Sequence, residues 1–562
     1  MFTNLLSAAH ALLRRFAGDT RGNFAMIFGL TLIPMFALAG SAIDFSNGVR
    51  LKAKLQASLD ATALATARYA SESTRTTTEI ETYANNFFSA NFTLTEFGAP
   101  PTITASADNT SVTLVASAST STYFIGIVGI NELGVGVDTT VTYANRTVDV
   151  ALVLDNSGSM GSESRLTNVK SAAKKFAEKL FGETTTNHPN LQIGIVPFNH
   201  TVNVGSQYAG ASWMDTGAVS PIHSENFSAP SNRFTLYSQI TRSGSSISWP
   251  GCVEVRPQPY DVYDYTVNAA DLEPDEAALG TPTDAQYFVP WFAPDEPDAT
   301  VSSNNVLKKW TKDNNYLSDG ISYNSTKDYL PSSSTPTSVH YDRWTERQQR
   351  VAKYTGSFSS SSNGPDKDCY IRAITDLENN LNPLETEIDA MVASGRTNIF
   401  QGFMWGWRLV SHEEPFTKGR DQTVDTNNLK FIVLLTDGSH VFGSNMNNPN
   451  ETDYGAYGYA ESNRLRIVGT NDASTRAKAM DGRLAKGCEH AKATGIKVFT
   501  ITYGSDLDVP DWDTTSDAAL TKAVMKGCSS GDGYYYHAPD STQAEAVFDS
   551  IAATINSLYL SE

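Results

Sequence analysis

The chain has 562 residues, of which 42 are Lys or Arg and 61 are Asp or Glu, so its net charge is −19. Hydrophobic residues make up 40% and aromatic residues 10%, which is enough to build buried cores and excludes a wholly disordered chain. The acidic balance argues against a nucleic-acid-binding protein, because phosphate recognition needs clustered Lys and Arg.

The first feature along the chain is an uncharged run over residues 24–43, FAMIFGLTLIPMFALAGSAI. As a helix it is ~30 Å long, about the thickness of a bilayer core, so we expect a transmembrane helix. The residues before it, 1–23, are expected to form a cytoplasmic N-terminus. Pro34 is expected to kink this helix without breaking it. A signal peptide cleaved after the sequence Ala37-Leu38-Ala39 is the alternative.

Charge does not orient this segment, because basic residues flank it equally on both sides. They are Arg14, Arg15 and Arg21 before it, and Arg50, Lys52 and Lys54 after it. All four cysteines lie beyond residue 250, in a large acidic body. Because disulfides form in oxidising compartments, the cysteines favour export of the C-terminal part.

Two further segments precede the main body of the chain. Residues 44–71 are expected to be helical, because small apolar residues recur every four positions along one stripe. These are Leu51, Leu55, Leu59, Ala63 and Ala67. The stripe can pack on a partner helix or cover its own domain. Alternation of Thr, Val and Ser along 100–145 predicts antiparallel strands, and thus a small β-containing stalk over 72–147.

From residue 148 onward, continuous apolar strands alternate with helices. The expected strands are 148–154, 192–198, 430–436 and 496–503, and the expected helices are 165–181, 475–494, 516–526 and 541–558. Strands that are apolar on both faces indicate a mostly parallel sheet covered by helices on both sides. We therefore predict a doubly wound, Rossmann-like α/β domain over 148–562.

One stretch of this region, residues 204–372, does not follow the alternation. It lacks a clear helical period and holds 12 of the 24 Tyr and 5 of the 8 Trp. The whole region also exceeds the ~250 residues that are usual for one domain. We predict that 204–372 is a loop-rich insertion whose aromatic residues build a small core of their own.

The four cysteines suggest two disulfides. Cys488 lies on the helix 475–494 and Cys528 ends the next helix, so neighbouring elements of one layer bring them within disulfide reach. Cys252 and Cys369 then form the other pair, whose closure of the insertion stabilises the fold by roughly 4 kcal/mol in the chain-entropy model. Free buried thiols are the alternative, and the cysteine spacing does not fit a zinc site.

Polar residues follow the expected strands at the edge where open α/β sheets bind ligands. Asp155, Ser157 and Ser159 come directly after the first strand, in the sequence DNSGSM. Asp437 follows a later apolar strand, and Thr397 lies in a turn just before a helix. Two carboxylates and three hydroxyls form an all-oxygen set that suits Mg²⁺ or Mn²⁺. Turn and N-cap residues that bind no metal are the alternative.

In these five residues the chain resembles a von Willebrand factor type A (VWA) domain with a complete metal-ion-dependent adhesion site. The resemblance implies that Ser157 and Ser159, with or without Thr397, contact the metal, while Asp155 and Asp437 act partly through water. It also implies an open coordination position. An Asp or Glu of a partner protein fills that position, so the site binds without turnover.

A narrower resemblance, to TadG-like proteins of bacterial tight-adherence (Tad or Flp) pilus loci, covers nearly the whole chain. It rests on RGNFA before the apolar run, Asp44 and LQASLDATALATAR after it, and on the later segments WPGCVEVR, FVPWFAPDE and NIFQGFMWGWRLVS. It implies a single-pass inner-membrane protein whose C-terminal domain lies in the periplasm and helps assemble or anchor Tad pili through other pilus or envelope proteins. A secreted or surface adhesin for an external ligand is the alternative.

The sequence contains none of the enzyme motifs G-x-S-x-G, G-x-x-x-x-G-K-[ST] or H-E-x-x-H. A hydrolase that uses the metal to activate water is a further alternative, for which only His440 is available as a base. We expect His440 to face solvent and not to serve as that base. We therefore expect that the protein is not an enzyme. Four Asp between residues 506 and 513 lack the glycine and the terminal Glu of an EF-hand loop and predict an exposed acidic loop.

Overall fold

The computed structural model describes residues 21–71, 76–92, 101–107, 111–142, 146–265, 267, 270, 272–280, 283–299, 303–510 and 512–560. Residues 1–20 of the predicted cytoplasmic N-terminus lie outside the described residues. The chain divides into two compact units that meet in the sequence between Asn145 and Arg146. Each unit has hydrophobic clusters of its own.

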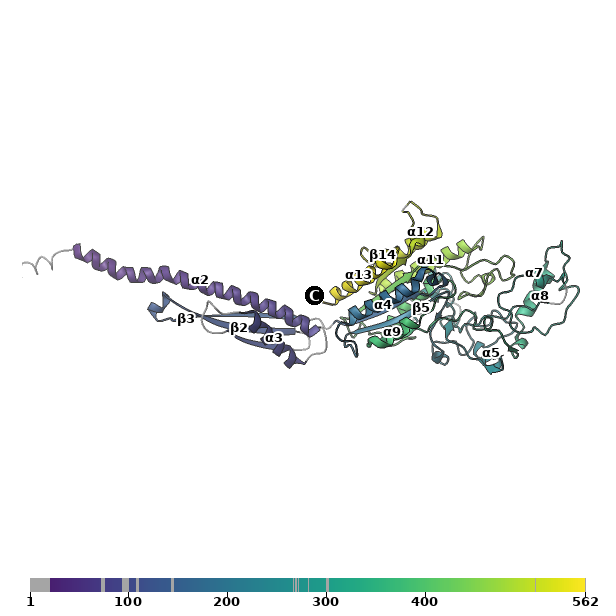
Figure 1. Cartoon of the computed structure of the whole chain (residues 1–562), viewed down its shortest axis with the longest axis horizontal. Helices are drawn as coiled ribbons and strands as arrows, with labels where there is room; N and C mark the ends of the chain where they lie inside the picture. Colours follow the sequence, from purple (N-terminus) through teal and green to yellow (C-terminus); the bar gives the residue numbers. More distant parts are fainter. Residues whose placement is uncertain are drawn as a thin grey trace, which may run out of the picture. The chain divides into compact units, whose positions relative to one another are not determined.

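The first unit is a long helix with a small antiparallel sheet along it (Figure 1). Helix α2 (Arg21–Ser71) runs without a break through the predicted membrane segment and the predicted helical segment, and includes Pro34. Strands β1 (Thr102–Ala107), β2 (Ser111–Ser121) and β3 (Glu132–Thr142) pair in that order. A helix that the strand alternation did not predict, α3 (Thr77–Asn91), begins with a capping box between Thr76 and Glu79.

The four-residue stripe of α2 covers its own domain. Leu51, Leu55 and Leu59 are fully buried and share one cluster with Val112 and Leu114 of β2. The N-terminal part of α2, in contrast, exposes its apolar side chains, among them Met26, Leu30 and Leu38. Among the described residues, α2 is the one helix that is long and apolar enough to cross a membrane.

Asp44 joins the two parts of the first unit. Its carboxylate accepts hydrogen bonds from the backbone N–H groups of Tyr123, Phe124 and Ile125, at 3.1, 2.8 and 2.8 Å. These residues lie at the start of η1 (Ile125–Val128), in the connection between β2 and β3. The carboxylate therefore fixes the end of the hairpin to α2.

The second unit is built on a six-stranded sheet with the order β11-β5-β4-β12-β13-β14. Its strands are β4 (Val148–Asp155), β5 (Leu191–Phe198), β11 (Thr375–Glu378), β12 (Leu429–Thr436), β13 (Lys497–Tyr503) and β14 (Tyr535–Ala538). All neighbours are parallel except the edge strand β11, which is antiparallel to β5. Every residue of the central strand β4 is buried, Asp149 included, as its mostly apolar sequence predicts.

Helices cover both faces of this sheet (Figure 1). One face carries α4 (Arg165–Phe181), α9 (Leu381–Ala390) and α13 (Ser541–Leu560), and the other carries α10 (Ile399–Val410), α11 (Ala473–Ala493) and α12 (Asp517–Cys528). Successive residues of β4 alternate between the two clusters: Leu152 packs under α4, and Val153 packs under α10. The prediction of a doubly wound, mostly parallel α/β fold is confirmed.

The described part of the insertion consists of short helices and strands joined by loops. They are α5 (Arg233–Gln239), β7 (Thr241–Arg242), β8 (Ser245–Ser246), β9 (Cys252–Val253), α6 (Pro274–Ala277), α7 (Val306–Lys309), α8 (Ser338–Gln348) and β10 (Ser357–Phe358). The two-residue strand β6 (Val202–Asn203) lies just before the insertion and pairs with β9. Among the described residues of the insertion, one small cluster, formed by Trp344 with Val306, Leu307 and Leu330, is separate from the main cores.

The prediction that the insertion's aromatic residues build their own core is wrong for most of them. Trp213, Trp249 and Trp291 belong to the same cluster as Val153 of the sheet. Trp213 contacts Trp405 of α10 with a ring-centroid distance of 6.2 Å. The reason is that every residue of α10 is buried, so its side facing away from the sheet needs a cover, which the insertion supplies.

Both predicted disulfides are present. Cys252 is bonded to Cys369 with a Cα–Cα distance of 5.9 Å, and Cys488 to Cys528 with 5.1 Å. The first closes the insertion, and the second joins α11 to α12. The alternative of free thiols is excluded, because no cysteine is unpaired.

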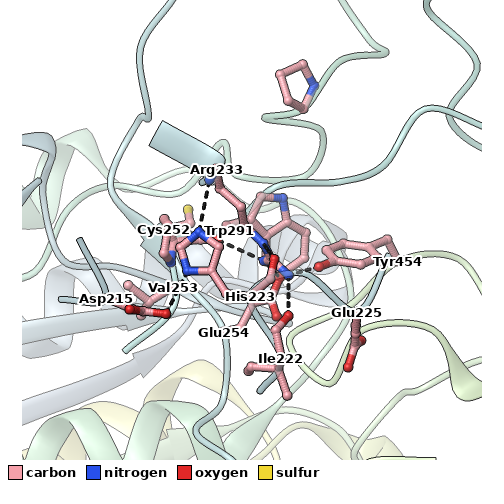
Figure 2. A network of polar contacts seen from close by, with 12 residues as sticks. Asp215, Ile222, His223, Glu225, Arg233, Cys252, Val253, Glu254, Trp291 and Tyr454 are labelled. Atoms are coloured by element: carbon pink, nitrogen blue, oxygen red, sulfur yellow. Dashed lines mark hydrogen bonds and ion pairs between the residues drawn. The ribbon is translucent and has the colours of Figure 1, made fainter. Parts of the chain in front are cut away.

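A buried network of charged groups holds the insertion together (Figure 2). The fully buried Arg233 pairs with Glu254, which also accepts hydrogen bonds from Tyr454 and from Arg464, both outside the insertion. Breaking a buried pair by removing one partner costs about 3–5 kcal/mol, so these contacts fix the insertion to the rest of the unit.

His223 completes this network on the side away from Glu254. Its Nδ1 lies 2.7 Å from Oδ2 of Asp215, and its Nε2 accepts the backbone N–H of Arg233 at 2.9 Å (Figure 2). Burial lowers the pKa of His223 despite the carboxylate beside it. Since Nε2 is an acceptor, the proton of the neutral ring lies on Nδ1, facing Asp215.

Candidate metal centre

Four of the five residues predicted to bind a metal are joined in a chain of hydrogen bonds. Oδ1 of Asp155 accepts the backbone N–H of Ser157 at 2.7 Å. The hydroxyls of Ser157 and Ser159 are 3.0 Å apart, and Ser159 donates to Oδ1 of Asp437 at 2.6 Å. The loops after β4 and β12 thus place two carboxylates and two hydroxyls in one cluster.

The sheet register explains this convergence. Strands β4 and β12 are parallel neighbours, with Leu154 opposite Leu435, so their carboxyl ends meet at one edge. The turn after Asp155 approaches a third loop, where Gly158 N–H donates to the Gly395 carbonyl at 2.9 Å. A Cβ on Gly158 would lie 3.2 Å from that oxygen, so this close approach favours glycine.

Thr397 lies in this third loop, which is joined to the loops after β4 and β12 by hydrogen bonds between backbone groups. Ser394 N–H donates to the Asn156 carbonyl at 2.8 Å, and Val441 N–H donates to the Thr397 carbonyl at 2.9 Å. Thr397 itself is buried. Within the described part of the chain, its hydroxyl takes no part in the hydrogen bonds that link the other four side chains.

The electrostatics of the cluster favour a cation. Asp155 is fully buried, and Thr436 donates to its Oδ2 at 2.8 Å. Burial, together with the charge of Asp437, raises the pKa of Asp155 to about 7. Carboxylate and hydroxyl oxygens are the ligands that Mg²⁺ and Mn²⁺ prefer, so the residues present fit such an ion. The site has two carboxylates and otherwise hydroxyl oxygens, and among the described residues there is no group of three or more His, Cys, Asp or Glu placed to hold a metal.

Arg165 is a charged residue of this site that the sequence reasoning missed. Its Nη1 donates to Oδ2 of Asp437 at 3.1 Å, and its Nη2 contacts Asp506 at 2.7 Å and Glu163 at 3.1 Å. Burial disfavours the guanidinium charge, but the hydrogen bonds to these carboxylates raise its pKa. A signal was available: Arg165 opens the predicted helix 165–181, where a cation opposes the helix dipole and needs a counter-charge.

The same contacts determine the state of Asp437. Burial raises the pKa of this carboxyl group, while the hydrogen bonds from Ser159 and Arg165 oppose the rise. Both of its oxygens are engaged, Oδ1 by Ser159 and Oδ2 by Arg165. Asp437 is therefore placed to orient the Ser159 hydroxyl.

The expectation that His440 faces solvent is wrong. The loop after β12 folds beneath the start of α10, so His440 is buried and its Nε2 accepts the backbone N–H of Phe400 at 3.3 Å. Its Nδ1 lies 3.7 Å from Oδ1 of Asp481, and burial lowers the pKa of His440 to about 3. A ring whose accepting nitrogen is occupied in this way is unsuited to take a proton from water.

The described Asp residues of the acidic loop each contact a different partner. Asp506 binds Arg165, the carboxylate of Asp508 lies 3.7 Å from His537, and Asp513 accepts the backbone N–H of Ser516 at the start of α12. Asp511 lies outside the described residues.

A cavity of about 210 Å³ lies beside the Thr397 loop. Gly395, Arg396 and Asn398 of that loop line it, together with His200 and Tyr457. Nε2 of His200 and the hydroxyl of Tyr457 are buried and have no hydrogen-bond partner among the described residues. The cavity is smaller than the ~300 Å³ at which drug-sized ligand pockets begin, so its size suits a single side chain.

Two parts of the chain match known protein families. Residues 22–68 match the family described as putative Flp pilus-assembly TadE/G-like, and residues 150–212 match the von Willebrand factor type A domain. The second match covers β4, the loop with Asp155, and β5, so the doubly wound unit is a VWA domain. No curated protein matches the sequence.

Several solved structures are similar in outline. The vWF domain of the type V pili tip protein Mfa5 from Porphyromonas gingivalis is 10% identical with a TM-score of 0.31, covering 74% of this chain and 97% of that chain. The tip pilin GBS104 from Group B Streptococcus agalactiae is 10% identical with a TM-score of 0.31, covering 74% of this chain and 100% of that chain. The pilus adhesin SpaC from Lactobacillus rhamnosus GG is 13% identical with a TM-score of 0.29, covering 82% of this chain and 35% of that chain. These similarities are too weak to carry a functional conclusion.

Proposed function

We propose that the VWA unit binds a partner protein through a divalent cation, Mg²⁺ or Mn²⁺, held by the loops that contain Asp155, Thr397 and Asp437. The observation that carries this proposal is the hydrogen-bonded chain from Asp155 through Ser157 and Ser159 to Asp437. Such a chain joins loops that are 278 residues apart in sequence at the edge where α/β sheets bind ligands.

Each residue has a distinct part in this proposal. The hydroxyls of Ser157 and Ser159 are the direct ligands, with Thr397 as a third. Asp155 supplies negative charge and fixes the loop through the Ser157 N–H, while Asp437 orients Ser159. When bound, the cation supplies a positive centre for a partner's Asp or Glu carboxylate.

The N-terminal part supports a role at the cell envelope. Its match to TadE/G-like proteins and the exposed apolar part of α2 favour a component of Tad or Flp pilus assembly or adhesion. We place the protein in the bacterial inner membrane, with α2 as a single-pass anchor and both disulfides in the periplasm. Its partners in this role are other pilus or envelope proteins.

A surface adhesin for an external ligand is the second candidate, and localisation separates the two. In an assembly component, antibodies should detect the protein in inner-membrane fractions and not on intact cells. Labelling of intact cells, together with loss of the apolar segment from the mature protein, would favour the adhesin.

The first test removes the central carboxylate. Asp155→Ala should abolish Mn²⁺ binding, measured by calorimetry on the full chain in detergent, because the hydroxyl ligands lose their counter-charge. The far-UV circular dichroism should be unchanged, since no apolar packing is lost. The matched control is Asp389→Ala, an exposed carboxylate on α9.

The same pair of variants tests partner binding. Pull-downs from membranes should recover partner proteins with the parent and with Asp389→Ala, and EDTA should release them. Asp155→Ala should recover none. If Asp155→Ala binds both Mn²⁺ and partners as the parent does, the site assignment is wrong.

A further inference from the structure

We propose that Arg165 is a built-in counter-ion that makes cation binding at the metal centre depend on the carboxylate of the partner. This inference rests on the proposed function and adds a regulation of the same site. Arg165 is 7% exposed, and its buried partner Asp437 is 0% exposed, whereas Glu163 and Asp506 are 72% and 69% exposed. The two outer carboxylates keep their contact with solvent, so among the buried groups the charge that the guanidinium offsets is that of Asp437.

The charge balance of the buried groups changes with Arg165. Asp155 and Asp437 alone would carry two negative charges, enough to balance a divalent cation. Arg165 reduces the sum to one negative charge, so a bound cation leaves one positive charge uncompensated. The carboxylate of a partner supplies the missing negative charge. Metal and partner should therefore each raise the affinity for the other by the same factor.

The backbone before Arg165 indicates that its position is imposed by these contacts. Glu163 and Ser164 have φ values of 51° and 57°, the left-handed region that non-glycine residues disfavour. Arg165 then begins α4, where a cation opposes the helix dipole. Two adjacent strained residues and an unfavourable helix position persist only where surrounding contacts over-determine them.

A glycine on the loop after β13 makes room for the guanidinium. Gly504 has a φ of 95°, and a Cβ there would lie 3.2 Å from Cζ of Arg165. This glycine follows β13 and precedes η8 (Ser505–Leu507), which carries Asp506. Arg165 thus joins the loops after β12 and β13, and its place at the metal centre is part of the fold.

The test measures Mn²⁺ affinity by electron paramagnetic resonance of free Mn²⁺, using the full chain in detergent. Acetate is the carboxylate probe, and chloride at equal ionic strength is the control. Acetate should raise the Mn²⁺ affinity of the parent at least about tenfold, within the usual range of coupling between sites. If acetate has no more effect than chloride, the proposal is overturned without any variant.

Three substitutions of Arg165 then assign the coupling to its charge. Without acetate, Arg165→Met and Arg165→Gln should bind Mn²⁺ at least about tenfold more tightly than the parent. The ratio of their Mn²⁺ affinities with and without acetate should fall towards one. Arg165→Lys keeps the charge and should behave as the parent. Arg372→Met, in an exposed ion pair with Glu387, is the distant control. If the neutral variants bind Mn²⁺ no more tightly than the parent, Arg165 does not have this role.

The failure of this inference differs from the failure of the proposed function. If the parent binds no Mn²⁺ even with acetate, or if Asp155→Ala binds it equally well, the metal centre itself is wrong. If the parent binds Mn²⁺ tightly at the Asp155 site without acetate, the site is right and only the role of Arg165 is wrong.

Discussion

At the scale of single residues, the carboxyl group of Asp481 predicts how stability depends on pH. Burial and the charge of Asp517 raise the pKa of Asp481 from 3.8 to about 7. The folded state therefore binds this proton more tightly than the unfolded state, and the free energy of unfolding falls as the pH rises from about 4 to 7. Each unit of difference in pKa between the folded and unfolded states corresponds to ~1.4 kcal/mol of stability. In Asp481→Asn, the free energy of unfolding should therefore fall by up to about 4 kcal/mol less over this pH range than it does in the parent.

Urea unfolding at several pH values in EDTA measures this effect. The control is Asp549→Asn, an exposed carboxylate on α13, which should keep the pH dependence of the parent. If Asp481→Asn loses stability with pH as steeply as the parent does, protonation of Asp481 is not the cause.

Residues of the candidate site differed in how far the sequence could predict them. Asp155, Ser157 and Ser159 follow a recognisable apolar strand, and Asp437 follows its neighbour in the sheet, so topology alone brings them together. Arg165 contacts carboxylates on two other loops through its long side chain, and such contacts cannot be predicted from the pattern of strands. His440 was misjudged for a related reason, because its burial depends on how a loop folds beneath α10.

At the scale of elements, the disulfides give a prediction with an internal control. The loops that the two disulfides close differ in length, with separations of 117 and 40 residues. For these lengths the chain-entropy model assigns about 5 kcal/mol to Cys252–Cys369, somewhat above the rough value expected from the sequence, and about 4 kcal/mol to Cys488–Cys528. Replacing the first pair by Ser should therefore lower the free energy of unfolding by about 1 kcal/mol more than replacing the second.

Denaturant unfolding of the two double variants, compared with the parent, measures this difference. Mass mapping without reductant should recover the two cross-linked peptide pairs. A larger loss from the Cys488–Cys528 pair would show that local packing of α11 on α12, and not loop length, determines the contribution.

The elements that the sequence predicted well are those with long apolar patterns. Strands β4, β5, β12 and β13 and helix α4 lie within one residue of their predicted bounds at each end. Helix α3 and the edge strand β11 were missed. α3 buries only three residues, and β11 has four residues and no continuous apolar run, so tertiary contacts determine them more than local pattern does.

At the scale of the whole molecule, the division at Asn145 and Arg146 predicts that the second unit folds alone. A chain of residues 146–562 should be recovered in the soluble fraction and bind Mn²⁺ as the full chain does, because its two main hydrophobic clusters, the small cluster around Trp344 and all site residues lie within it. The full chain should remain in membranes after carbonate washing. If the shortened chain aggregates or loses the metal, the two units depend on each other.

The direction of β4 gives the VWA unit a mechanical property. The unit begins at Arg146, whose Nη1 donates to the Leu558 carbonyl at 2.5 Å, and β4 leads from Val148 to Asp155 at the opposite edge, ~23 Å away. Tension between a tether at Arg146 and a ligand held near Asp155 would run lengthwise through this central strand. Hydrogen bonds to β5 and β12 on either side would then be sheared together instead of being unzipped one by one, a geometry that resists rupture.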